Sequence, residues 1–226
     1  MIHLRALCAW MYTAACPAVQ NQQRQKTAEL HERMVKKGAV KSLLTLLAGS
    51  EDAEAQRFAA LALANVASAV FNRVAMVEEG ALEPLIHFCR EETADLIGRQ
   101  YCAMCLGNLA AEPENHEEIV KLEAVDALMI LLRTEDVESG RYAAFAISNL
   151  AANANHRQQI VDEGGPEALV ALACCEDLNA QRQALAALRG ICISPQFREL
   201  VVRQGILDPL VLMARTEEVR RGKHGE

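Results

Sequence analysis

The sequence predicts an all-α solenoid of tandem repeats, and three observations lead to that class. The phrase ISNLAANANHRQQIVDEGG, which begins at Ile147, has two weaker copies upstream, beginning at Leu63 and Leu106. The closing position of the phrase recurs at intervals of 42, 43, 41 and 41 residues, and its central asparagine position recurs at 43, 41 and 41. Apolar residues make up 51% of the 226 residues but aromatic residues only 4%, which favours an aliphatic, alanine-rich core of closely packed helices.

Each repeat of about 42 residues is predicted to contain three helices. A short amphipathic segment such as 155–164 (NHRQQIVDEG) ends at a glycine, which can turn the chain at positive φ without steric cost. A second helix follows, as in 165–175 (GPEALVALACC), with proline within its first turn. An acidic stretch such as 133–138 (RTEDVE) opens the longest helix, because acids complement the positive end of a helix.

The turn glycine is missing from one repeat. It stands at Gly38, Gly80, Gly164 and Gly205, but Glu123 replaces it in the repeat between Gly80 and Gly164. A residue with a side chain costs about 1 kcal/mol in the left-handed conformation. We therefore expect the turn at Glu123 to be looser or differently shaped.

The repeat boundaries predict a single domain over residues 1–226. Residues 1–37 hold a partial leading repeat plus a polar insertion, because LRALCAWMYTAA (4–15) aligns with QRFAALALANVA (56–67). The same leading stretch could be a signal peptide, but its start is weakly charged and Thr13 interrupts it. Residues 205–226 hold a partial last repeat and tail. The four repeats between them are 38–79, 80–122, 123–163 and 164–204.

Both predicted ends cut through a repeat. Solenoids normally carry polar capping repeats at their ends, and none is evident in this sequence. We therefore expect the chain to be part of a longer protein.

Charge and cysteine usage limit the classes of function. The net charge of −7 gives no electrostatic support for binding nucleic acid. Most of the eight cysteines lie inside apolar stretches, so we expect reduced, buried thiols and a cytoplasmic location, with the nucleus as the alternative. Cys102 and Cys105 lie within a long helix rather than at its start, which favours core packing over redox chemistry.

Sequence motifs that carry catalysis are missing. The chain has no GxSxG nucleophile turn, no GxxxxGK[ST] phosphate loop, no GxGxxG and no second cysteine pair at zinc spacing. We therefore predict that the protein is not an enzyme and uses no cofactor or metal. His116 and His156 occupy equivalent places before two of the short helices, where we interpret them as solvated loop residues.

Three helices per repeat, with a phrase of the form xLxNLA ending the third, resemble the armadillo repeat from about residue 30 to 215. The resemblance implies a right-handed superhelix whose third helices line a concave groove. It also implies a non-catalytic scaffold or adaptor that binds an extended segment of a partner protein in that groove.

Importin-α-like relatives line this groove with a tryptophan and, one turn later, an asparagine. In them the asparagines hold the peptide backbone and the tryptophans stack against basic side chains. In this chain the asparagine position holds Asn65, Asn108 and Asn149. The tryptophan position holds Leu61, Met104 and Phe145. The fourth repeat has Ala186 and Gly190 at the two positions, so the asparagine row is present without the tryptophans.

A second polar row lies eight residues before the asparagine position, on the same face of each long helix. It consists of Arg57, Gln100, Arg141 and Arg182. Arginine at this place favours a ligand with acidic or phosphorylated side chains. The alternative is that these arginines pair with acids at the helix starts and that the asparagines bond neighbouring repeats.

Without the tryptophans, the chain resembles the vacuole-anchored and plakophilin-like armadillo adaptors more than importin-α. Such adaptors act at membranes, junctions or the cytoskeleton, so any contact with a membrane is expected to be indirect. One alternative is the substrate-binding part of a U-box ubiquitin ligase, which would need a U-box upstream of Met1. The other is a nuclear-transport adaptor, which would need the tryptophans and an arginine-rich tail.

Overall fold

The computed structural model describes residues 32–211 and 214, and the elements in this part of the chain are helices joined by turns. No strand occurs within these residues, so the all-α prediction is confirmed. The chain divides into two compact units, one ending at Leu122 and one beginning at Glu123.

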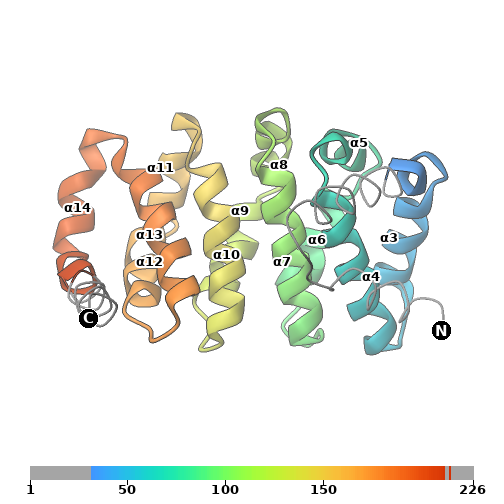
Figure 1. Cartoon of the computed structure of the whole chain (residues 1–226), viewed down its shortest axis with the longest axis horizontal. Helices are drawn as coiled ribbons and strands as arrows, with labels where there is room; N and C mark the ends of the chain where they lie inside the picture. Colours follow the sequence, from blue (N-terminus) through green and yellow to red (C-terminus); the bar gives the residue numbers. More distant parts are fainter. Residues whose placement is uncertain (1–31, 212–213, 215–226) are drawn as a thin grey trace, which may run out of the picture. The chain divides into compact units, whose positions relative to one another are not determined.

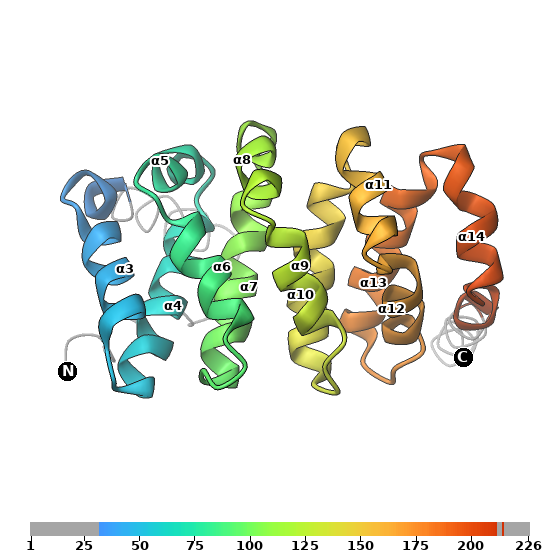
Figure 2. The same cartoon turned by 180° about the vertical axis from the view of Figure 1, so that it is seen from behind.

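Between Ala39 and Lys121, the first unit contains two medium helices, two long helices and two short α-helices. The long helices α4 and α7 pack side by side (Figure 1), and the medium helices α3 and α6 lie on the opposite side of this unit (Figure 2). The elements are α3 (Ala39–Gly49), α4 (Ala53–Ala67), η1 (Val70–Asn72), α5 (Arg73–Glu78), α6 (Leu82–Arg90), α7 (Leu96–Ala110), η2 (Pro113–Asn115) and α8 (His116–Lys121).

The second unit repeats the same order of helices. Its long helices α10 and α13 pack side by side and face the viewer in Figure 1, whereas its medium helices α9 and α12 face the viewer in Figure 2. The elements are α9 (Ala124–Leu132), α10 (Val137–Leu150), α11 (Ala154–Asp162), α12 (Gly165–Ala173), α13 (Leu178–Cys192), η3 (Pro195–Phe197) and α14 (Arg198–Arg203).

Small residues let the long helices approach closely. In α4, Ala59, Ala60 and Ala64 are fully buried, as the alanine-rich composition predicts. In α13, a Cβ added to Gly190 would lie 2.9 Å from the Cβ of Ala151, at the end of α10. No side chain fits at this position without moving one of the two helices. The fourth repeat therefore holds glycine where three other repeats hold asparagine.

An aspartate caps the start of each long helix. The carboxylates accept hydrogen bonds from backbone N–H groups of Glu54 (2.9 Å), Gly98 (2.7 Å), Ser139 (2.7 Å) and Ala180 (2.7 Å). The caps are Asp52, Asp95, Asp136 and Asp177. These bonds satisfy N–H groups that have no partner inside the helix, so the interpretation of the acidic stretches as helix starts is confirmed.

Asp95 also accepts two hydrogen bonds from the preceding repeat. Arg57 Nε and Nη2 lie 2.9 and 2.6 Å from the two carboxylate oxygens of Asp95. This guanidinium holds the pKa of Asp95 below its usual range, and the same bond raises the pKa of Arg57. One aspartate therefore caps α7 and joins α7 to α4.

A residue in the first turn of each short helix bonds the end of the long helix before it. In each case a side-chain nitrogen reaches the backbone carbonyl six residues earlier. The pairs are Arg73 with Ala67 (3.2 Å), His116 with Ala110 (2.7 Å), Arg157 with Ala151 (2.8 Å) and Arg198 with Cys192 (2.9 Å). The side chains thus satisfy carbonyl groups that the helix leaves without a partner.

The burial of the two histidines corrects the prediction made for them. His116 and His156 are 4% and 7% exposed, so the interpretation as solvated loop residues is wrong. The reason is that the chain folds back over the end of the long helix and buries the residues that make the turn.

Glu123 adopts the left-handed conformation of the glycines that it replaces. Its φ is 57°, against 74° to 92° for Gly38, Gly80, Gly164 and Gly205. The expectation of a differently shaped turn is therefore wrong. The repeat keeps its geometry, and Glu123 carries the backbone strain instead.

Cys89, Cys102 and Cys105 are fully buried in the first unit. Burial raises the pKa values of the Cys102 and Cys105 thiols, which disfavours the reactive thiolate. The prediction that this cysteine pair serves core packing is confirmed.

Within the described residues, no single helix is both long and apolar enough to cross a membrane. The segments Ala53–Ala67 and Val70–Glu78 pass that test only as a pair, and they meet at an angle of 110°.

Replacing Glu123 with glycine should stabilise the protein by about 1 kcal/mol, because glycine tolerates the left-handed backbone. Gly80→Ala is the matched opposite change, since a Cβ there meets no atom within 4 Å and the backbone alone decides the outcome. It should destabilise by about 1 kcal/mol. Urea unfolding followed by circular dichroism measures both. Destabilisation by Glu123→Gly would contradict the strain assigned to this turn.

Asp95→Ala should destabilise the protein by about 2 kcal/mol, because it removes both a helix cap and an ion pair. Asp177→Ala, which removes a cap alone, should cost about 1 kcal/mol. Because Asp95 has a lowered pKa in the folded protein, its contribution is complete at neutral pH and decreases as the pH falls below about 4. Urea unfolding of the three proteins from pH 7 to pH 3 tests this. A difference between wild type and Asp95→Ala that does not change over this range would argue against the ion pair.

Candidate functional site

The first unit places the predicted groove residues of α4 and α7 on neighbouring helices. Leu61, Asn65, Met104 and Asn108 are all half-buried, so each presents part of its side chain to solvent. Because α4 and α7 pack side by side (Figure 1), the rows of two repeats lie next to each other. The result is a continuous strip of apolar and amide groups within this unit.

Asn108 joins the two helices of this strip. Its side-chain nitrogen donates to the backbone carbonyl of Ala64, with a nitrogen–oxygen distance of 3.0 Å. The alternative that asparagines bond neighbouring repeats therefore holds at this position. A carboxamide has two N–H groups and an accepting oxygen, so one such bond leaves it further capacity for a peptide backbone.

The polar row of the first unit is less available to a ligand. The charge of Arg57 is balanced by the two bonds to Asp95, as the alternative interpretation proposed. Gln100 is only 8% exposed. In this unit the apolar and amide rows therefore offer more surface to a partner than the polar row does.

The second unit places the predicted residues of α10 on one exposed strip. Phe145 and Asn149 are half-buried there. Arg141 Nε donates to Glu138 at 2.9 Å, and the guanidinium lies 4.2 Å from the ring centre of Tyr142. The charge of this arginine is thus balanced within its own helix.

Arg182 in α13 differs from the other two arginines. It is exposed, and no residue in the described range 32–211 bonds or pairs with it. The next turn carries Ala186, and Gly190 is buried against Ala151. The surface beside Arg182 on α13 is therefore formed by small residues and is open to solvent.

One row of surface residues was missed by the sequence analysis. Phe58, Tyr101 and Tyr142 lie three residues before the tryptophan position, at intervals of 43 and 41 residues. All three are half-buried on the same strips of the long helices. Their spacing was readable from the sequence, but only the tryptophan position was compared. The long helices therefore carry aromatic surface one helical turn before the tryptophan position.

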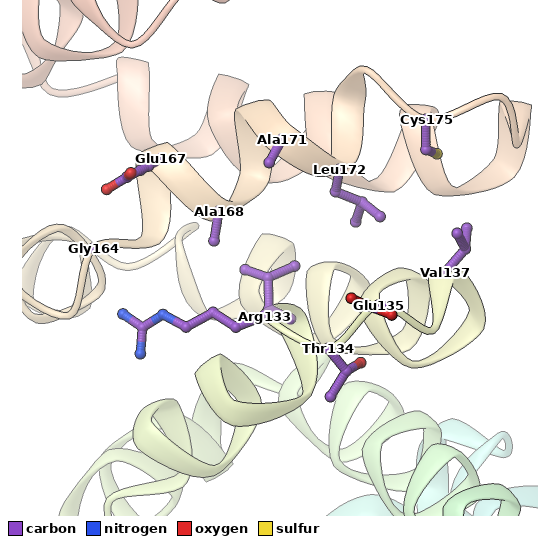
Figure 3. Close-up of a pocket in the computed structure, with 11 residues that line it drawn as sticks. Arg133, Thr134, Glu135, Val137, Gly164, Glu167, Ala168, Ala171, Leu172 and Cys175 are labelled. Carbon is purple, nitrogen blue, oxygen red and sulfur yellow. The ribbon is translucent and has the colours of Figure 1, made fainter.

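The medium helices border two grooves, one within each unit. The groove in the second unit lies between α9 and α12 (Figure 3) and has a volume of about 490 Å³. The groove in the first unit lies between α3 and α6 and has a volume of about 570 Å³. Across residues 32–211 no group of three or more His, Cys, Asp and Glu side chains is arranged to hold a metal ion.

Comparison with protein families finds one match. Residues 153–193 match the family model described as the armadillo/beta-catenin-like repeat. This stretch holds α11, α12 and α13, which are one short, one medium and one long helix.

A curated relative is Vacuolar protein 8 of Schizosaccharomyces pombe, which is 34% identical over 86 residues. These residues are 38% of this chain and 15% of the relative, so the matched part spans a small fraction of that protein. The similarity agrees with the resemblance to the vacuole-anchored branch.

Two solved structures share the fold over most of the chain. An engineered protein is 28% identical, with a TM-score of 0.75, and the match covers 88% of this chain and 85% of the other. A structure of computationally designed armadillo repeat proteins for modular peptide recognition is 25% identical, with a TM-score of 0.74 and coverage of 82% and 80%. The repeat period, the order of the helices, the family match and these structures lead to one conclusion: the chain is an armadillo-repeat protein.

Proposed function

We propose that the chain is a non-catalytic scaffold that binds an extended segment of a partner protein along the exposed strips of its long helices. The observation that carries this proposal is the strip on α4 and α7. Each of these helices presents a half-buried apolar side chain and a half-buried amide, and the pair recurs at the repeat spacing. Apolar side chains supply buried area, and amides can bond both the N–H and the carbonyl groups of a peptide backbone.

The solved structures support a peptide as the ligand. The designed armadillo repeat proteins that share this fold were made for modular peptide recognition. Extended peptides suit such a surface because their backbone groups are unpaired and can bond side chains at regular intervals.

The proposed segment carries acidic or phosphorylated side chains where it meets α13. Arg182 and Arg189 lie seven residues apart on that helix, so they share a face. Both are exposed, and neither bonds or pairs with another residue in the range 32–211. In contrast, Arg57 and Arg141 are already paired with Asp95 and Glu138. The preference for anionic groups is therefore assigned to the fourth repeat rather than to the whole row.

The proposed location is the cytoplasm, with the nucleus as the alternative, and any contact with a membrane is indirect. Three cysteines buried as free thiols support a reducing compartment. The net charge of −7 favours a protein partner over nucleic acid.

The triple variant Asn65→Ala, Asn108→Ala, Asn149→Ala should lose its partners, with affinity for a captured partner falling on the order of 100-fold if each amide contributes about one net hydrogen bond. Affinity purification with quantitative mass spectrometry compares this variant with the wild type. Asn155→Ala, which alters an exposed asparagine of α11, is the matched control. Circular dichroism verifies that the triple variant stays folded. A folded triple variant that retains every partner would place the binding site elsewhere.

The double variant Arg182→Ala, Arg189→Ala should bind phosphoserine peptides about tenfold more weakly, because two cations are removed. Arg57→Ala should change the same binding less than about twofold, since Asp95 already balances that charge. Retention of a peptide library with one fixed phosphoserine, beside its serine counterpart, measures both. Equal losses in the two variants would argue against an anionic preference centred on α13.

A further inference from the structure

The groove between α9 and α12 is a second candidate binding surface within the second unit. It is lined by the segment from Leu132 to Val137 on one side and by α12 on the other (Figure 3). Ala168, Ala171 and Leu172 of α12 face that segment across the groove (Figure 3). The volume of about 490 Å³ is in the range of sites that hold a small ligand or a large side chain.

The floor of the groove is apolar. Leu132 and Leu172 are almost fully buried beneath it, and the small side chains of Ala168 and Ala171 leave it open. Val137 at one end is 38% exposed, which leaves apolar surface in contact with water. An apolar side chain that entered the groove would remove this surface from water.

The charged groups at the rim favour a cation. The one cationic side chain in the lining, Arg133, donates to the backbone carbonyl of Glu163 at the end of α11. Glu135 and Glu167 also line the groove, and both are exposed without an ion-pair partner in residues 32–211. The rim therefore presents two carboxylates and one guanidinium around an apolar floor, with negative charge in excess.

The groove of the first unit shares part of this chemistry. Its lining includes the buried Leu47 and Phe88, together with Glu83, Glu91 and His87. Glu83 and Glu167 occupy equivalent positions, since each lies three residues after the turn glycine of its repeat. An apolar floor with an acidic rim is thus present between the medium helices in both units.

This surface differs from the one assigned to the extended segment. In the second unit α9 and α12 face the viewer in Figure 2, whereas α10 and α13 face the viewer in Figure 1. A ligand in the groove would therefore leave Asn149 and Arg182 open. The two surfaces also differ in charge, because exposed arginines mark α13 and exposed glutamates mark the groove.

We propose that the groove between α9 and α12 binds a second protein segment, in which an apolar side chain is flanked by lysine or arginine. The apolar side chain fills the space above Leu132 and Leu172, and the basic side chain pairs with Glu135 or Glu167. The inference goes beyond the proposed function, because it concerns the opposite face of this unit and a ligand of opposite charge.

Cys175 allows a direct test, because it lines the groove and is half-buried, whereas Cys174 beside it is exposed and outside the lining. The full chain is equilibrated with mixed disulfides of cysteamine and 2-mercaptoethanol that carry acetyl-leucyl-lysine, acetyl-leucyl-glutamate or acetyl-seryl-lysine. The thiolate of Cys175 attacks the probe disulfide, forms a new disulfide with the cysteamine sulfur and releases 2-mercaptoethanol. Peptide mapping by mass spectrometry gives the occupancy at each cysteine.

The leucyl-lysine probe should occupy Cys175 about five times more than either other probe, and Cys174 should show no such preference. In the variant Glu135→Gln, Glu167→Gln, the preference for lysine over glutamate should vanish while the preference for leucine over serine remains. Equal occupancy of Cys175 by the three probes, or the same preference at Cys174, would overturn the proposal. A preference for lysine that survives both substitutions would overturn the role of the rim.

Discussion

The packing of one long helix against the next is the constraint on which the rest of each unit depends. It buries Ala59, Ala60 and Ala64 of α4, and it leaves no room for any side chain at Gly190 in α13. The buried faces also hold large aliphatic side chains such as Leu63, Leu106 and Ile147, and a half-buried strip of each long helix remains beside them. That strip holds the amide, apolar and aromatic rows, so helix packing also determines which residues can meet a partner.

The ends of the helices show how far sequence reasoning reaches. The aspartate caps were predictable, because an acid in front of a helix has a local role that spacing alone reveals. The burial of His116 was not, since a residue that follows a turn looks like a loop residue until the turn folds it onto the carbonyl of Ala110. Glu123 shows a further limit. The sequence identifies an unfavourable residue, but whether the turn changes or the residue accepts the strain depends on the packing around it.

The same distinction applies to the candidate site. The period placed Asn65, Asn108 and Asn149 at one position of the repeat, and the structure shows each of them half-buried. Partners across repeats were much harder to foresee. Arg57 pairs with an aspartate 38 residues away, whereas Arg141 pairs with a glutamate three residues away. Equivalent positions therefore differ in charge balance, and only the three-dimensional arrangement separates a neutralised arginine from an available one.

The two bonds between Arg57 and Asp95 have a consequence for how the first unit unfolds. Asp95 caps the start of α7, and Arg57 of α4 supplies the guanidinium that bonds it. Each of the two helices is therefore bonded to the neighbouring repeat. Asn108 and Asn115 add bonds from the later repeat to the carbonyls of Ala64 and Arg73 in the earlier one. In a linear array, such interface bonds couple the melting of one repeat to that of its neighbour. Repeats joined in this way lose their structure together, so cooperativity in this unit resides in contacts between repeats as much as in the helices themselves.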